Sequence, residues 1–183
     1  MASIQHSALT GAELHEPKGA DAASAGEVYV ADGAGSGVWT PSSLFAELYI
    51  TAGAGTQALT TTAARLDPST SWTSGVVNGV TQTPADGTLT IGVAGTYAMS
   101  FWISFNTDAV AANTIYTFYY AIDGVAQARS VAVGKVTAGV DRVTCSATGL
   151  ATLDATDVLS IYAKSSTNST ITVVDAGFNV HKV

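Results

Sequence analysis

One segment of the chain alternates between large apolar residues and smaller or polar ones with the period of a β-strand. Residues 95–105 read GTYAMSFWISF, and the residues that share one parity are Tyr97, Met99, Phe101, Ile103 and Phe105. Successive side chains of a strand point to opposite faces, so this pattern predicts a strand of about ten residues with one buried face. The same β character continues from about residue 49 to the C-terminus.

Further strand-like segments follow at fairly regular spacing: 114–122, 141–153, 157–165 and 169–183. Turn signals separate the runs, at Asp67-Pro68, Asn78-Gly79, Asp86-Gly87, Asp123-Gly124 and Asn168-Ser169. An Asp-Gly pair between two apolar runs predicts a hairpin, and the mixed parity of the last segment predicts a bulge near Asp175–Gly177. Without amphipathic helices or short repeats, the pattern predicts an all-β, antiparallel jelly-roll sandwich.

The composition changes near residue 48. Residues 1–48 are rich in Gly, Ala, Ser and acids and hold few large apolar side chains, whereas the rest of the chain can supply its own core. We therefore predict two parts, an extended N-terminal arm over 1–48 and a β domain over 49–183. Within the arm, 27–31 has strand character and 32–37 reads as a flexible loop. Residues 43–50 are interpreted as a short helix, because Pro41 stands where helices often begin.

Charge excludes several functions. The net charge is −7, only 11% of residues are charged, and there is no basic run, so we expect no nucleic-acid binding. Residues 1–48 hold six acids and one base, Lys18, which suits either a basic groove on a partner or simple solvation. The chain has no run of about 18 apolar residues, and its start lacks the features of a signal peptide. We expect neither membrane insertion nor export by the ordinary route.

Residues that could carry chemistry are few. Cys145 is a lone cysteine in an alternating segment, which favours a small core residue over a nucleophile. His6 and His15 with Glu13 could bind a metal only if several arms met on an axis, and ordinary hydrogen bonding is the more economical interpretation. Asp154 and Asp157 flank a turn, and no nucleophile elbow or phosphate loop is present. We therefore predict no catalytic residue, no metal site, no cofactor and no enzyme activity.

The C-terminal part, over about residues 50–183, resembles the C1q/TNF-like jelly roll. The resemblance is carried by Gly95-Thr96-Tyr97, by Ile122-Asp123-Gly124, and by the run from Leu153 through Asp157 to Leu159. The ending GFNVHKV is similar to the last strand of that family. Thr156 departs from the pattern, because it stands where that family usually has glycine. The resemblance implies a compact homotrimer, and the aromatics that it suggests for the trimer interface are Tyr119, Tyr162 and Phe178.

The N-terminal segment resembles a motif of structural proteins from tailed bacteriophages, in which L-T-G-x-x-L-H-x-P-K-G precedes V-Y-V-A-x-G-x-G and a tryptophan. This resemblance implies an anchor to the virion. Its candidate anchoring residues are Leu9, Leu14, His15, Pro17, Lys18, Val28, Val30 and Trp39. The apolar ones suit a segment that folds on binding, and three arms per trimer would add avidity.

Three functional hypotheses follow from these resemblances. The first is a non-enzymatic virion protein, a trimeric capsid decoration protein or short head fibre docked on the major capsid protein or another virion protein. The alternative is a tail-fibre tip that recognises host surface glycans through loops around 106–113 and 164–170. A secreted cytokine-like or C1q-like module is opposed by the apparent lack of a signal peptide and of a collagen repeat.

Overall fold

The computed structural model divides the chain into two compact units, residues 1–42 and 43–183. It describes residues 23–24, 26–31, 37–53, 55–68, 72–108, 113–137 and 142–183. All regular structure in these ranges is β, as predicted. No helix in the described part of the chain is long and apolar enough to cross a membrane.

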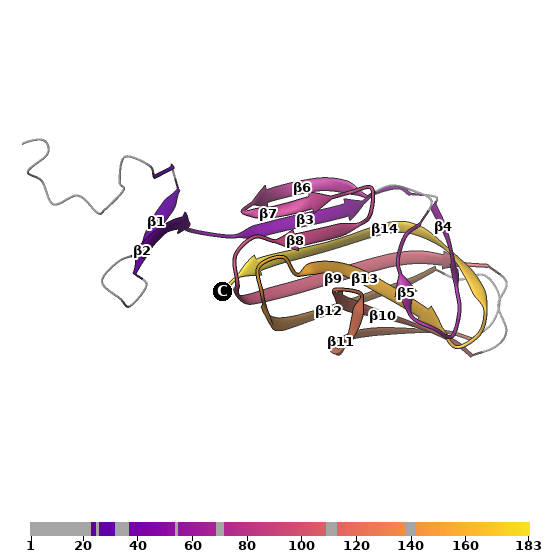
Figure 1. The fold of residues 1–183 in the computed structure, drawn as a ribbon. Coiled ribbons are helices and arrows are strands. Elements are labelled where there is room, and N and C mark those ends of the chain that lie inside the picture. Colours follow the sequence, from indigo (N-terminus) through magenta and orange to yellow (C-terminus); the bar gives the residue numbers. More distant parts are fainter. Residues whose placement is uncertain are drawn as a thin grey trace, which may run out of the picture. The chain divides into compact units, whose positions relative to one another are not determined.

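The first unit contains a two-stranded antiparallel hairpin, β1 (Glu27–Ala31) and β2 (Gly37–Pro41) (Figure 1). On one face, Tyr29 pairs with Trp39, and their rings meet edge to face with centroids 5.3 Å apart. On the other face, Val28, Val30 and Val38 are about half exposed. The predicted strand at 27–31 is confirmed, and it is one half of a hairpin within the arm that was expected to be extended.

The second unit is a sandwich of two antiparallel sheets (Figure 1). The first sheet has the order β12-β9-β14-β3-β6, with β4 also paired to β14. Its strands are β3 (Phe45–Ile50), β4 (Gly55–Leu59), β6 (Thr73–Asn78), β9 (Gly95–Thr107), β12 (Arg142–Leu153) and β14 (Ser169–Lys182). The second sheet has the order β11-β10-β13-β8-β7, with β5 also paired to β13. Its strands are β5 (Ala64–Arg65), β7 (Val80–Thr83), β8 (Thr88–Ile91), β10 (Thr114–Ile122), β11 (Val125–Val136) and β13 (Val158–Ser165).

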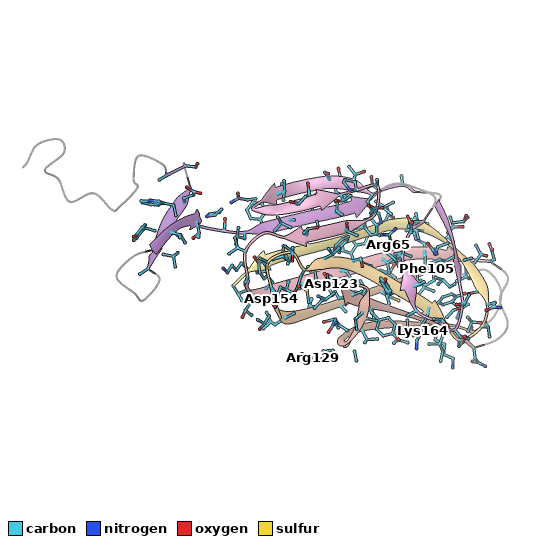
Figure 2. All side chains as sticks on the ribbon, in the orientation of Figure 1. Arg65, Phe105, Asp123, Arg129, Asp154 and Lys164 are labelled. Atoms are coloured by element: carbon cyan, nitrogen blue, oxygen red, sulfur yellow. The ribbon has the colours of Figure 1, made fainter. Side chains whose placement is uncertain are left out.

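The core fills the space between the two sheets. The alternating apolar residues of β9 all point inward and are buried, as their shared parity predicts. Phe105 of β9, labelled in Figure 2, is one of these residues. Its ring meets that of Tyr116 of β10 at 5.1 Å between centroids, and Phe101 meets Tyr120 at the same distance. The Tyr120 hydroxyl donates to the backbone carbonyl of Asn179, which joins the two sheets. Its burial raises the pKa of Tyr120 well above the usual value.

Turns and the bulge lie close to where the sequence places them. The β10–β11 hairpin turns at Asp123 and Gly124, both with positive φ. The pairing of β14 with β9 shifts register between Val173 and Asp175, so the bulge is confirmed but begins before the predicted position. The bulge directs the Asp175 carboxylate to the outer surface, where it accepts hydrogen bonds from Arg142 and from the Ala52 amide.

The predicted helix at 43–50 is wrong, because these residues form β3. Leu44, Ala46, Leu48 and Ile50 are all buried, which is a period of two rather than of 3.6. β3 pairs with β14 on one side and β6 on the other. The sandwich therefore begins at residue 43, and residues 43–48, which were assigned to the arm, belong to it.

Candidate functional site

The residues with potential catalytic chemistry, Cys145, Asp154 and Asp157, have structural roles in this fold. Cys145 lies in β12 opposite Ile103, is 5% exposed, and burial raises the pKa of its thiol. A raised pKa lowers the thiolate fraction at neutral pH, which is the opposite of what a nucleophile needs. The Asp157 carboxylate accepts a hydrogen bond from the Asp154 amide across the β12–β13 turn. These two acids therefore close a turn.

The metal hypothesis involved His6, His15 and Glu13, which lie outside the described residues. Within the described ranges, no group of three or more His, Cys, Asp and Glu side chains could hold a metal ion. His181 lies near the end of β14 on the outer face of its sheet.

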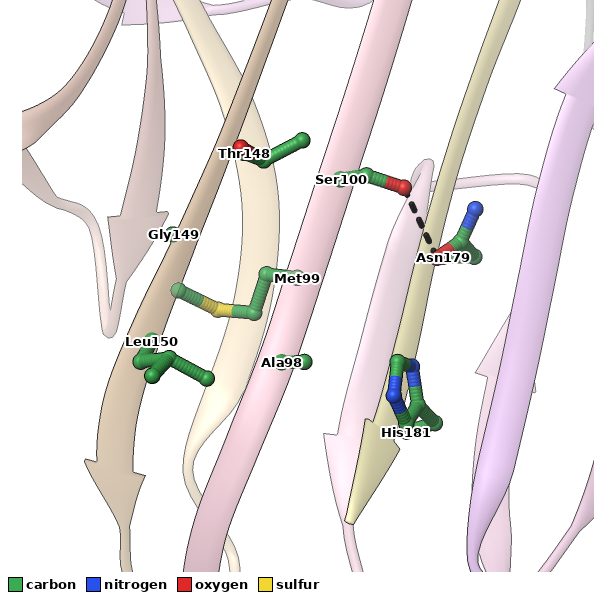
Figure 3. Close-up of a pocket in the computed structure, with 8 residues that line it drawn as sticks. All are labelled: Ala98, Met99, Ser100, Thr148, Gly149, Leu150, Asn179 and His181. Atoms are coloured by element: carbon green, nitrogen blue, oxygen red, sulfur yellow. Dashed lines mark hydrogen bonds between the residues drawn. The ribbon is translucent and has the colours of Figure 1, made fainter. Parts of the chain in front are cut away.

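The outer face of the β12-β9-β14-β3-β6 sheet, here called the Trp102 face, is built as rows of side chains across the strands. The register places Leu150, Ala98, His181 and Phe45 in one row. The next row contains Thr148, Ser100, Asn179 and Glu47, and the third contains Ser146, Trp102, Gly177 and Tyr49. The Ser100 hydroxyl hydrogen-bonds the Asn179 side-chain oxygen at 2.9 Å (Figure 3).

Trp102 lies near the middle of this face and is 40% exposed. A Cβ added at Gly177 would lie 2.7 Å from the indole Nε1, so the ring packs directly against the backbone of β14. The missing side chain at Gly177 lets a large aromatic lie close to the sheet while presenting apolar area to solvent. Trp102 is therefore an ordered, surface-exposed aromatic.

Two shallow hollows adjoin each other on the Trp102 face and share Asn179 and His181. One has a volume of about 310 Å³ and is lined by Ala98 and Leu150 among others (Figure 3). The other has a volume of about 290 Å³ and is lined by Phe45, Glu47 and Val76. Glu47 is the one formal charge in the three rows described above, apart from the titratable His181. These three rows thus mix apolar and uncharged polar side chains with a single formal charge, and the Arg142–Asp175 ion pair lies farther along the same face.

The opposite sheet carries a different outer face, here called the Tyr119 face. Tyr119 and Tyr162 are direct cross-strand neighbours on β10 and β13, and both are half-buried. The same face presents Arg65, Lys135 and Lys164. The Lys164 ammonium lies 5.6 Å from the centre of the Tyr119 ring. Aromatic and basic groups therefore gather on this side of the sandwich.

The structure does not bring the three predicted trimer residues together. Tyr119 and Tyr162 are on the Tyr119 face, whereas Phe178 lies in the core against Trp72. The prediction that Phe178 contacts a neighbouring copy is wrong for its side chain, because that residue is 1% exposed. The role of Tyr119 and Tyr162 between copies stays a prediction.

Of the predicted anchoring residues, Leu9, Leu14, His15, Pro17 and Lys18 lie outside the described residues. Val28 and Val30 share one face of the hairpin, and Trp39 lies on the other. The Trp39 Nε1 is buried without a hydrogen-bond partner within the described structure.

The Trp102 face was not predicted, although the sequence contains one signal for it. Within 95–105 the apolar parity excludes Trp102, so the largest side chain of that segment falls among its small and polar residues. Tryptophan is enriched at interfaces, so one on the solvent parity of a strand marks a position to test for contact with a partner. Its neighbours Asn179 and Glu47 come from strands distant in sequence, and no local pattern indicates them.

Structural similarity to known proteins identifies the type of fold. No family model matches the chain, and no curated protein matches it. The structure is similar to Eiger TNF from S. frugiperda, with a TM-score of 0.55 at 12% identity over 76% of this chain and 93% of that one. It is also similar to the globular domain of the zebrafish complement 1qA protein, with a TM-score of 0.52 at 11% identity, covering 75% and 94% of the two chains. Residues 43–183 therefore form an antiparallel jelly roll of the C1q/TNF-like type.

Proposed function

We propose that this protein is a non-enzymatic structural protein of a tailed-phage virion. In this proposal it is a homotrimeric capsid decoration protein or short head fibre, held to the particle by its N-terminal segment. The observation that carries the proposal is the Trp102 face, which has the composition of an interface between copies of one chain.

The chemistry of the Trp102 face supports self-association. Interface cores are depleted in charged residues and enriched in aromatic ones, and buried tryptophans often dominate the binding energy. Trp102, Phe45 and Leu150 supply apolar area here, and the Ser100 hydroxyl already donates a hydrogen bond to the Asn179 side-chain oxygen. Burying this face would therefore remove apolar surface from water while desolvating few charges.

The hairpin supports the anchoring role. An isolated two-stranded hairpin is at best marginally stable in water, so β1 and β2 need a further surface to pack against. Val28, Val30 and Val38 offer an apolar face for such packing. Together with the motif resemblance upstream, this favours a docking element that is stabilised on the particle. Three copies per trimer would multiply the avidity of a modest single contact.

The self-association part is tested by Trp102→Glu, measured by light scattering of the full chain. The wild type should have the mass of three chains. Trp102→Glu should shift the mass toward one chain, because a carboxylate at the interface centre has no partner charge. Val125→Glu is the matched control, because Val125 is an exposed valine at the start of β11 in the other sheet, and it should leave the trimer intact. A wild-type monomer would overturn this part.

The anchoring part is tested on particles that lack the protein. Purified wild type should bind them, and a Val28→Glu and Val30→Glu double variant should bind much more weakly while keeping its trimer mass. Binding by the double variant at wild-type strength would show that the hairpin is not the anchor. Failure of the wild type to bind any such particle would overturn the virion role.

The second candidate is a tail-fibre tip that recognises host glycans. The β13–β14 turn favours it, because Ser166, Thr167 and Asn168 are exposed there and offer hydroxyl and amide groups. Adsorption of residues 43–183 to host cells would support this alternative, whereas labelling of the head alone in electron micrographs would count against it.

A further inference from the structure

The Tyr119 face combines features that the assembly proposed above does not use. The register places Arg65, Tyr162, Tyr119 and Val131 in one row across β5, β13, β10 and β11. Beside it, the next row contains Lys164, Thr117 and Val133. Arg65 belongs to β5 and Lys164 to β13, and both residues are labelled in Figure 2.

The two tyrosines are cross-strand neighbours. They are directly opposite each other in the β10–β13 ladder, and both project from the outer side of the sheet. A Cβ at Gly124 would lie 3.2 Å from the Tyr162 hydroxyl, so the glycine turn leaves room for this ring. Half-buried tyrosines of this kind offer an apolar ring surface together with a polar hydroxyl.

A shallow hollow of about 200 Å³ begins at the row next to the tyrosines, which contains Thr117 and Lys164. Its lining residues are Thr61, Ile115, Thr117, Lys164, Ser165 and Ser166. The Ser166 hydroxyl accepts a hydrogen bond from the Ile115 amide, which holds the rim in place. The hollow therefore presents hydroxyl groups around an aliphatic floor, with the Lys164 ammonium at its edge.

The Tyr119 face is richer in basic residues than the rest of the chain. Three of the chain's seven basic residues, Arg65, Lys135 and Lys164, lie on it, although the net charge is −7. Arg65 is paired with Asp67 and Asp86. Within the described ranges, neither Lys135 nor Lys164 forms an ion pair. Lys164 lines the hollow, and Lys135 is the cross-strand neighbour of Ile115, which also lines it. Their positive charge favours an anionic ligand.

We propose that the Tyr119 face binds a carboxylated saccharide. A sugar ring has an apolar C–H face that packs on Tyr119, whose ring neighbours Lys164, and hydroxyls that hydrogen-bond Thr117 and Ser166. Its carboxylate pairs with Lys164. The hollow is smaller than the roughly 300–1,000 Å³ pockets that hold drug-sized ligands, so it fits one sugar unit and binds it weakly. Because it uses the opposite face, this inference does not depend on the Trp102 face or on the virion role.

The experiment is an NMR titration of the full chain with D-glucuronate, and with acetate and glucose as reference ligands. Glucuronate should shift the amide signals of Tyr119, Tyr162 and Lys164 saturably at millimolar concentration, while acetate and glucose should produce little change. Lys164→Gln should weaken glucuronate binding about tenfold, and Lys164→Arg should restore most of it. Arg129→Gln is the matched control, because Arg129 lies outside the hollow, and it should bind like the wild type.

Several results would overturn the inference. If acetate shifts the same signals as much as glucuronate does, the site is a general anion site. If glucose does so, the carboxylate and its pairing with Lys164 do not contribute to binding. Absence of saturable shifts with glucuronate would also reject it, as would a preference for a poly-glutamate peptide over the sugar. The thermal unfolding of each variant shows whether it is folded. Absence of binding is interpreted only for variants that are folded.

Discussion

Replacing Thr156 by glycine should stabilise the protein, which is an unusual expectation for a mutation to glycine. Thr156 lies in the β12–β13 turn with φ at 82°, a left-handed conformation that β-branched residues rarely adopt. Its side chain is exposed, and its amide donates to the Ile91 carbonyl at 2.8 Å. The backbone conformation is therefore held by the turn, and the threonine Cβ is the strained part.

The magnitude follows from two opposing effects. Relief of the left-handed strain should contribute about 1–2 kcal/mol. The greater freedom of glycine in the unfolded chain should cost about 0.4–1 kcal/mol. The difference between these ranges is about 0–1.6 kcal/mol, and its midpoint of about 0.8 kcal/mol corresponds to roughly 2–3 °C in the melting temperature of a chain of this size.

Thermal unfolding at a fixed protein concentration measures this gain. Thr156→Ala should change little, because alanine retains the Cβ that causes the strain. Thr152→Gly is the matched control: Thr152 is equally exposed but lies within β12, so glycine there should destabilise by about 1 kcal/mol. The reasoning is refuted if Thr156→Gly melts at or below the temperature of the wild type.

Three further predictions concern the core. Phe105→Ala should lower the free energy of unfolding by about 3–5 kcal/mol, because its ring contacts Tyr116 and Phe118 across the sheets; a loss below about 1 kcal/mol in denaturant titration would contradict that packing. Tyr120→Phe should cost about 1 kcal/mol at neutral pH by removing the hydroxyl bond to Asn179. Because the pKa of Tyr120 is raised in the folded state, its contribution is fully present below about pH 10 and is lost as the pH rises above that value. Wild-type stability should therefore fall above about pH 10, and Tyr120→Phe should fall less steeply; equal slopes would reject the burial of this hydroxyl. Cys145 should react with a thiol reagent only as the chain unfolds, since it is buried and its thiol pKa is raised; fast labelling of the native protein would contradict its place in the core.

Local patterns predicted the parts of the fold that depend on short-range chemistry. The parity of 95–105 identified β9 and its buried face, and the Asp123-Gly124 pair identified the β10–β11 hairpin. The departure at Thr156 from a glycine pattern also has a structural counterpart, because that residue has positive φ.

Long-range pairing decided the parts that the local patterns did not predict. The segment 43–50 has apolar residues at 44 and 48 and at 46 and 50, spacings that also fit a helix. Its pairing with β14 and β6, more than 20 residues away in each case, makes it a strand. The Trp102 face and the Tyr119 face could not be predicted for the same reason. Each is assembled from four or more strands, and the sequence does not specify their register. Phe178 was assigned to an interface on the family resemblance, and the parity of its segment does not tell which face of β14 is covered.

We propose that this chain is a virion protein that assembles through its Trp102 face. The most direct measurement is a three-dimensional reconstruction of the phage particle that would carry it. We expect three-fold clusters on the head surface, in which the Trp102 faces of three copies meet around the axis and the β1–β2 hairpins contact the capsid. A particle without copies of the protein, or one whose copies leave Trp102 open to solvent, would contradict it.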